Sequence, residues 1–111
     1  MATEAVVCLS TCANAEEAEK IARALVEEQI AACVNLVPGV RSIYRWEGKI
    51  EDAQEVLLVI KSRKHLVDQM LFRLRQLHSY AVPELVVLDV ADGNPDYLTW
   101  LADSTWGARR R

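Results

Sequence analysis

The sequence predicts an α+β fold built from two β-α-β units and a third helix at the C-terminal end. Short apolar runs rich in valine, leucine and isoleucine are separated by segments with apolar residues at helical spacing. Asparagine or serine precedes each helical segment, and a Glu-Gly turn signal joins two of the apolar runs directly. The predicted order is therefore β-α-β-β-α-β-α. Its first six elements form the split βαβ pattern of a ferredoxin-like sandwich.

The first strand and helix are predicted from the segment between residues 5 and 27. Ala5 to Thr11 is a short β-rich run. Asn14 then supplies a helix N-cap, with Glu17 at the third helical position in a capping-box-like pattern. The predicted buried stripe of this helix comprises Ala18, Ile21, Ala22 and Leu25.

A long hairpin is predicted next. Ala31 to Trp46 is strand-like, and Pro38-Gly39 should bend it or introduce a bulge, because proline donates no ladder hydrogen bond. Glu47-Gly48 turns the chain into a return strand, Glu55 to Lys61. Fully extended, residues 31–46 would span roughly 50 Å, against roughly 23 Å for the first strand. The hairpin tip is therefore expected to overhang its own sheet.

The second unit follows the same logic. Ser62 is predicted to cap a helix that ends near His78, with a buried stripe of Leu66, Val67, Met70, Leu74 and Leu77. Pro83 opens a fourth strand from Glu84 to Val90. Asn94-Pro95 then starts the third helix, with proline at its first helical position.

The predicted strands are apolar on both faces. Runs such as VVCL, VLLVI and LVVL have no polar alternation, although successive side chains of a strand point to opposite faces. The first two helices can cover one face of such a sheet. The other face would expose a large apolar patch unless the chain associates with copies of itself.

Composition limits the function classes. The 111 residues indicate a single domain, 1–111, and 51% hydrophobic residues with a net charge of −3 are typical of a globular protein. Nucleic acid is an unexpected partner, and the basic tail Arg109 to Arg111 is interpreted as a solvated end. No apolar run is long enough to cross a membrane. Three unpatterned cysteines and the absence of a secretory signal favour the cytoplasm.

Reactive side chains are predicted to converge at one edge of the sheet. In this topology the end of the first strand, the hairpin turn, the end of the second helix and the start of the fourth strand share that edge. The residues are Cys12, Glu47, His78, Tyr80 and Glu84, with Trp46 close by. Tyr44 and Trp46 stand two positions apart near the hairpin tip, where they could line a cleft and pack on a neighbouring subunit.

Cys12 and His78 are a candidate ligand pair for copper or zinc. Cys12 precedes a helix N-terminus, where a thiolate is favoured, and thiolate with imidazole suits soft or borderline metals. Structural alternatives stay open, since Cys12 could be a small loop residue and His78 could cap its helix. Cys8 and Cys33 are interpreted as core thiols.

Other chemistries find little support. The glycines, at positions 39, 48, 93 and 107, match no phosphate-binding motif, and no organic cofactor is predicted. A thiol enzyme with Cys12 as nucleophile and His78 as base is conceivable, but no orienting group or oxyanion donor is evident. The chain is therefore predicted not to be an enzyme.

Three stretches, AACVNLVPGVRSIYRWEGKI, EVLLVIK and LHSYAVPELVVLDVADGNPDYLTWL, resemble the CutA family of divalent-cation tolerance proteins. The resemblance implies a ferredoxin-like subunit in a tight homotrimer similar to PII signalling proteins, with a role in copper or other divalent-metal tolerance. It also implies metal ligands at a cysteine near the end of the first strand and at histidines before an H-P-Y-x-x-P-E segment. His78 and Cys12 fit this pattern, whereas Leu77 and Ser79 depart from it.

Two functions are therefore predicted. The first is a cytosolic, trimeric metal-tolerance protein that binds a divalent ion through His78 and Cys12. The alternative is a PII-like signalling or scaffold module that binds a small metabolite or a partner protein at clefts between subunits. The predicted cleft residues are Tyr44, Trp46, Glu47, Tyr80 and Glu84.

Overall fold

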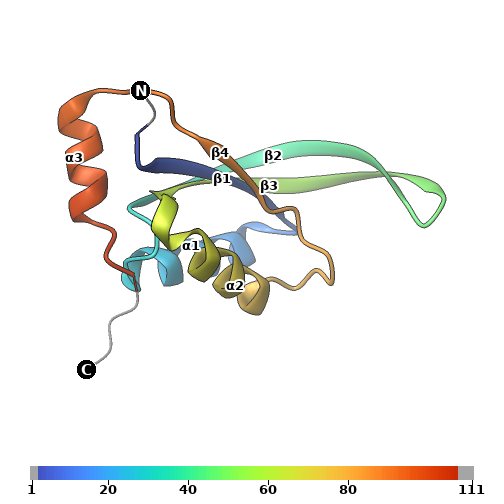
Figure 1. The fold of residues 1–111 in the computed structure, drawn as a ribbon. Coiled ribbons are helices and arrows are strands. Elements are labelled where there is room, and N and C mark those ends of the chain that lie inside the picture. The colour runs from blue at the N-terminus through green and yellow to red at the C-terminus, as the bar shows by residue number, and fades with distance from the viewer. Residues whose placement is uncertain (1–2, 108–111) are drawn as a thin grey trace.

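The computed structural model describes residues 3–107, so the predicted role of Arg109 to Arg111 lies outside the described residues. The predicted element order is confirmed (Figure 1). The elements are β1 (Ala5–Cys12), α1 (Ala15–Glu27), β2 (Cys33–Trp46), β3 (Lys49–Arg63), the short 3₁₀ helix η1 (Lys64–Leu66), α2 (Val67–Leu77), β4 (Val86–Asp89) and α3 (Pro95–Asp103).

The four strands form one antiparallel sheet in the order β2-β3-β1-β4, as an α+β fold of the ferredoxin-like type requires. Helices α1 and α2 lie side by side under one face of this sheet, whereas α3 stands at the end of the sheet near the N-terminus (Figure 1). The opposite face carries no helix within residues 3–107 (Figure 1).

The start of α1 agrees with the prediction in one half of the capping pattern. The Asn14 side chain accepts a hydrogen bond from the Glu17 backbone N–H at 2.8 Å. The Glu17 carboxylate accepts hydrogen bonds from the backbone N–H and the hydroxyl of Ser79, at 2.7 and 3.0 Å. This side chain therefore ties the start of α1 to the loop that follows α2.

The predicted cap of the second helix is wrong. Ser62 lies inside β3, and its hydroxyl donates to the Ile30 carbonyl at 2.6 Å. A turn of 3₁₀ helix intervenes, and α2 begins only at Val67, without a side-chain cap. The return strand extends beyond the predicted Glu55 to Lys61 on both sides, because its full length pairs with β1 or β2. The cap of α3 is as predicted, with Asn94 accepting from the Asp96 N–H at 3.0 Å.

The two faces of the sheet differ sharply in burial. On the helix side, Leu58 and Ile60 are completely buried with the inner faces of α1 and α2. On the other side, Leu57 and Val59 are half-buried, and the edge residues Val86 and Leu88 are 45% and 49% exposed. One face of the sheet is therefore buried under the helices, as predicted, and the other face is an open apolar surface.

The hairpin overhangs the sheet, as predicted. Pairing between β1 and β3 ends at Cys12 and Val56, whereas β2 and β3 continue to the Trp46 and Lys49 pair. The predicted irregularity lies between Val37 and Val40. We call residues 40–55 the arm, which projects beyond the other strands in Figure 1. Its two-residue turn needs φ > 0 at both Glu47 (50°) and Gly48 (79°), which glycine provides at no steric cost.

Candidate functional site

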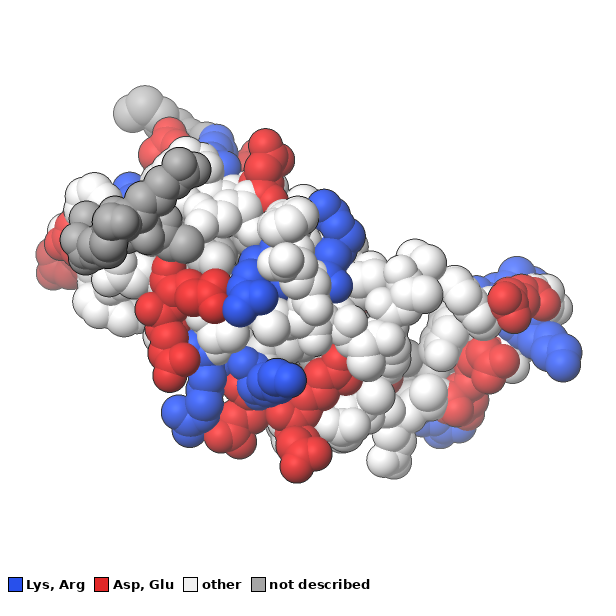
Figure 2. Space-filling model, turned by 90° about the horizontal axis from the view of Figure 1, so that it is seen from below, with Lys and Arg blue, Asp and Glu red and all other residues white. Residues whose placement is uncertain are grey.

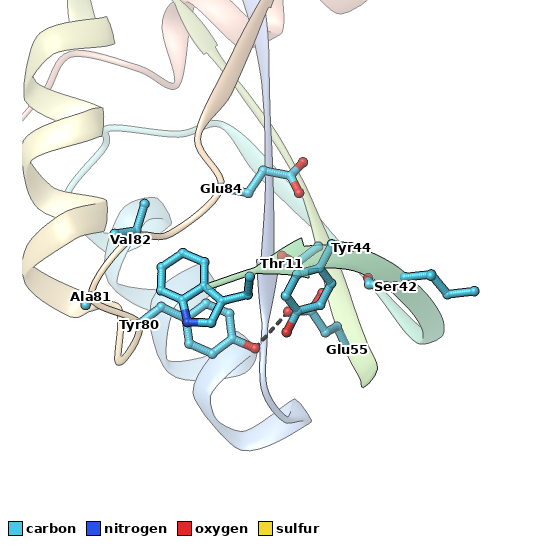
Figure 3. A pocket seen from close by; sticks show the side chains of 10 residues that line it. Thr11, Ser42, Tyr44, Glu55, Tyr80, Ala81, Val82 and Glu84 are labelled. Carbon is cyan, nitrogen blue, oxygen red and sulfur yellow. Dashed lines mark hydrogen bonds between the residues drawn. The ribbon is translucent and has the colours of Figure 1, made fainter. Parts of the chain in front are cut away.

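A pocket of about 600 Å³ lies between the arm and the loop of residues 80–84 (Figure 3). The arm reaches it from beyond the end of β1, and the loop reaches it on its way from α2 to β4. Figure 2 shows the molecule from the side that the helices cover. In this view, the tip of the arm carries both acidic and basic side chains. The pocket is lined by Thr11, Ser42, Ile43, Tyr44, Trp46, Glu55, Tyr80, Ala81, Val82 and Glu84.

The structure brings together four of the five residues predicted for a cleft. Tyr44 and Trp46 contribute from the arm, and Tyr80 and Glu84 contribute from the loop. Glu47 stands in the turn at the arm tip and does not line the pocket, because the strands carry that turn past it. That this pocket is a cleft between subunits stays a prediction.

Sequence reasoning missed Glu55. This carboxylate is only 8% exposed, and its Oε2 accepts a hydrogen bond from the Tyr80 hydroxyl at 2.7 Å (Figure 3). Glu55 was interpreted only as the polar first residue of an apolar strand. The hairpin register could have found it, because alternation places Glu55 on the same face of the arm as Ser42 and Tyr44.

Tyr80 acts as a hydrogen-bond donor in this pair. Burial, followed by the hydrogen bond to Glu55 and the negative charge of that carboxylate, raises the pKa of Tyr80 well above its usual range. The phenol therefore keeps its proton at neutral pH. A neutral phenol that donates to Glu55 partly satisfies a buried carboxylate at the wall of the pocket.

His78 packs against the Tyr80 ring and hydrogen-bonds to its backbone. The imidazole is buried, and its ring lies 4.7 Å from the Tyr80 ring. Its Nδ1 accepts a hydrogen bond from the Tyr80 backbone N–H at 3.1 Å, which assigns the ring proton to Nε2. Nε2 then donates to the Thr11 carbonyl at 2.7 Å. His78 therefore links the end of β1 to the pocket loop, and both of its nitrogens are engaged.

Cys12 lies beside His78 but is not primed as a thiolate. Its Sγ is 4.0 Å from the histidine Nε2, and the side chain is completely buried. Burial, followed by the negative charges of Glu17 and Glu55, raises the pKa of Cys12 to about 12. Burial and these charges oppose the predicted thiolate, which the dipole of α1 would favour.

The Cys12 and His78 pair does not fit a preformed divalent-metal site. The chemistry of thiolate and imidazole suits copper or zinc, and the two side chains are adjacent. However, the thiol is protonated and both ring nitrogens already have partners. Within residues 3–107, no three His, Cys, Asp or Glu side chains are grouped to hold a metal ion. Metal binding here would require His78 to release a partner.

The site borders the open face of the sheet. Thr11 pairs with Leu57, and Leu9 pairs with Val59, so these four side chains share one face. Glu55 precedes Leu57 by two positions and continues that face toward the arm. A molecule or subunit that covered the open face would therefore reach the edge of the pocket.

Comparisons with known proteins give one consistent result. Residues 6–104 match the family model described as "CutA1 divalent ion tolerance protein". The chain is 50% identical over 99 residues to the divalent-cation tolerance protein CutA of Thermus thermophilus, covering 89% of this chain and 96% of that protein. It is 42% identical to the chloroplastic protein CutA of Arabidopsis thaliana, covering 90% of this chain and 55% of that protein.

The fold comparison agrees. The solved structure of CutA from Xylella fastidiosa superposes with a TM-score of 0.90 at 43% identity, covering 92% of this chain and 98% of that one. Within the part of the chain that the structure describes, no helix is long and apolar enough to cross a membrane.

Proposed function

Because the chain belongs to the CutA1 family of divalent ion tolerance proteins, we propose that it takes part in the tolerance of divalent metal ions, copper among them. The observation that carries this proposal is the 50% identity to a protein named for that tolerance, over 96% of its length. The family and this relative are named for tolerance and not for an enzymatic activity. We therefore propose that this chain acts by binding and not by catalysis.

Complementation tests the metal-tolerance proposal. A bacterial strain that lacks its own relative is transformed with this chain and grown on graded copper, zinc and cobalt. Restored growth on at least one ion supports the proposal. Growth equal to that of the empty vector on all three ions, with the chain expressed and folded, contradicts it.

We further propose that the protein assembles as a homotrimer through the open face of the sheet. Leu57, Val59 and Leu88 belong to a contiguous apolar surface that a lone soluble protomer would leave in water. The arm projects beyond its own sheet and is free to contact a neighbour (Figure 1). The number of copies rests on the family resemblance.

Native mass spectrometry and light scattering test the assembly. Leu88→Lys should convert the trimer to smaller species, because a lysine on the open face cannot be buried without loss of hydration. Phe72→Lys is the matched control, since Phe72 is 57% exposed on α2, away from that face. A folded parent that stays monomeric at high micromolar concentration would contradict the proposal.

Direct metal binding through His78 and Cys12 is a separate proposal. Proximity and ligand chemistry support it, although the fold must first release a histidine nitrogen. Calorimetric titration with copper should show binding that weakens in His78→Ala. A parent protein that releases no heat of binding removes this direct role and leaves the tolerance proposal to the growth assay.

A second candidate function is the binding of a small ligand in the pocket. Its volume lies within the range of small-molecule sites, and it combines aromatic and carboxylate side chains. Small molecules that copurify with the native protein are identified by mass spectrometry after denaturation. A compound retained by the parent and lost in Trp46→Ala supports this function.

We also propose a cytoplasmic location, which the three free thiols support and cell fractionation tests.

A further inference from the structure

The charge of the pocket lining has a single sign. Glu55 and Glu84 are its two charged residues, and neither lysine, arginine nor histidine lines it within residues 3–107. The remaining lining is aromatic, aliphatic or hydroxylic. Low-dielectric walls strengthen the field of such carboxylates inside a pocket, so a cation is attracted and an anion is repelled.

Glu55 has unused hydrogen-bonding capacity. An ionised carboxylate accepts about four hydrogen bonds, and Tyr80 donates one to Oε2. Among the described residues, no group donates to Oε1 of Glu55. Glu55 lines the pocket and its free oxygen is not sealed from that space, so a molecule in the pocket can reach this oxygen. A ligand N–H⁺ group would satisfy the free oxygen with a charge-assisted hydrogen bond.

The aromatic rings favour the same kind of ligand. Tyr44 and Trp46 are 43% and 46% exposed, although both line the pocket. Figure 3 shows Tyr44 next to Glu55 and Tyr80, with Glu84 above them. A cation held over an aromatic face within about 6 Å of the ring centre is attracted by the negative face of the ring, and this attraction strengthens as the cation is desolvated. Rings and carboxylates together are complementary to an ammonium group.

We propose that this pocket binds a small organic amine as its ammonium ion, with the charged nitrogen at Glu55 and the carbon part against Val82 and the arm rings. This inference rests on the proposal that the pocket is a ligand site. The volume of about 600 Å³ accommodates an arylalkyl amine. A bare Mg²⁺ or Ca²⁺ ion would gain fewer contacts, because these hard cations take six or more oxygen ligands and the two carboxylates of the pocket supply at most four.

Three probes of similar shape and different charge test the ligand class. 2-Phenylethylamine is cationic, 2-phenylethanol is neutral and 3-phenylpropionate is anionic at pH 7. Calorimetry on the native assembly should give at least tenfold tighter binding for the amine than for the alcohol, and no binding for the acid. Glu55→Gln keeps an acceptor for Tyr80 and removes the charge, so it should weaken amine binding at least tenfold.

Glu27→Gln is the matched control, because Glu27 is exposed on α1 outside this pocket, and its amine affinity should equal that of the parent. Equal affinities for amine and alcohol, or a Glu55→Gln variant that binds as the parent does, overturn the ammonium proposal and leave the pocket as a ligand site. A folded protein that binds none of the probes overturns both. A carbodiimide cross-link from Glu55 to a lysine of a second copy also overturns the ammonium proposal, because the lysine of that copy would already occupy the cation site.

Discussion

Neighbouring residues of β3 meet opposite surroundings. Leu58 is completely buried under α1 and α2, whereas Leu57 and Val59, one position away on either side, are half-buried on the open face. In sequence, all three belong to one uninterrupted apolar run, VLLVI. The difference teaches that one face stabilises the protomer and the other is available for something outside it, and the pocket borders that second face.

The largest expected effect compares leucines of the two faces. Leu58→Ala should lower the free energy of unfolding by about 2–5 kcal/mol, because it leaves a cavity under the helices. Leu88→Ala removes a side chain that is 49% exposed in the protomer. Its cost should shrink when the protein is diluted below the concentration at which it assembles, because assembly then contributes no stability.

Urea unfolding at two protomer concentrations checks this difference. The Leu58→Ala cost should be the same at both. If the Leu88→Ala cost is also independent of concentration, the open face does not act in assembly.

The second effect concerns the residue that joins the core to the pocket. His78→Ala removes the hydrogen bonds to the Thr11 carbonyl and from the Tyr80 N–H, and it leaves a cavity beneath Tyr80. A loss of roughly 2–4 kcal/mol is expected in urea unfolding. His65→Ala is the control, since His65 is exposed on η1 and should cost little. Equal costs for the two variants would show that His78 does not support the pocket loop.

The sequence predicted the elements well because their signals are local. Asn14 and Asn94 cap helices where expected, and Pro38-Gly39 marks the irregularity in β2. Ser62 misled because a serine before a helical pattern can also be a buried strand residue that bonds a distant carbonyl. That choice depends on where Ile30 lies, and a local pattern does not carry such information.

The site was predicted less completely because its chemistry depends on burial. Topology alone placed Tyr80, Glu84 and the arm rings together. It did not show that Cys12 would be dry enough to stay protonated, or that both nitrogens of His78 would be occupied. Glu55 was missed because its partner, Tyr80, is 25 positions away.

The third effect is the pH dependence of the free energy of unfolding, which reports how well two thiols on the helix-covered face are buried. Burial raises the pKa of Cys12 from 9.0 to about 12 and that of Cys8 to about 11. The folded protein holds these protons more tightly than the unfolded chain does. Their stabilisation is therefore complete below pH 9 and is lost between pH 9 and pH 12, by at most about 1.4 kcal/mol per pH unit for each thiol.

Urea unfolding at pH 7.5 and pH 10 measures this loss. Cys12→Ala should show a smaller decrease between the two pH values than the parent, because it lacks one of the two thiols with a raised pKa. Alkylation gives a second readout, because a buried protonated Cys12 should react more slowly than a free thiol at neutral pH. A faster reaction would indicate a nucleophile and would restore the thiol-enzyme hypothesis.

The smallest effect concerns the link between α1 and the pocket loop. Glu17 accepts two hydrogen bonds from Ser79, next to Tyr80. Because Ser79 is exposed and water can replace the lost acceptor, Glu17→Ala should cost only about 0.5–1.5 kcal/mol of stability. Its clearer consequence is local: the amide of Ser79 loses its acceptor, so its hydrogen exchange should accelerate while the amides of β1 and β3 keep their protection.

Glu16→Ala is the matched control, since Glu16 shares the first turn of α1 and is exposed. If exchange at Ser79 is unchanged in Glu17→Ala, the loop is held from below by His78 alone. If it accelerates and amine binding weakens with it, the first turn of α1 also positions Tyr80 against Glu55. Contacts on the helix-covered side of the sheet would then position the pocket residues, while the pocket itself borders the open face.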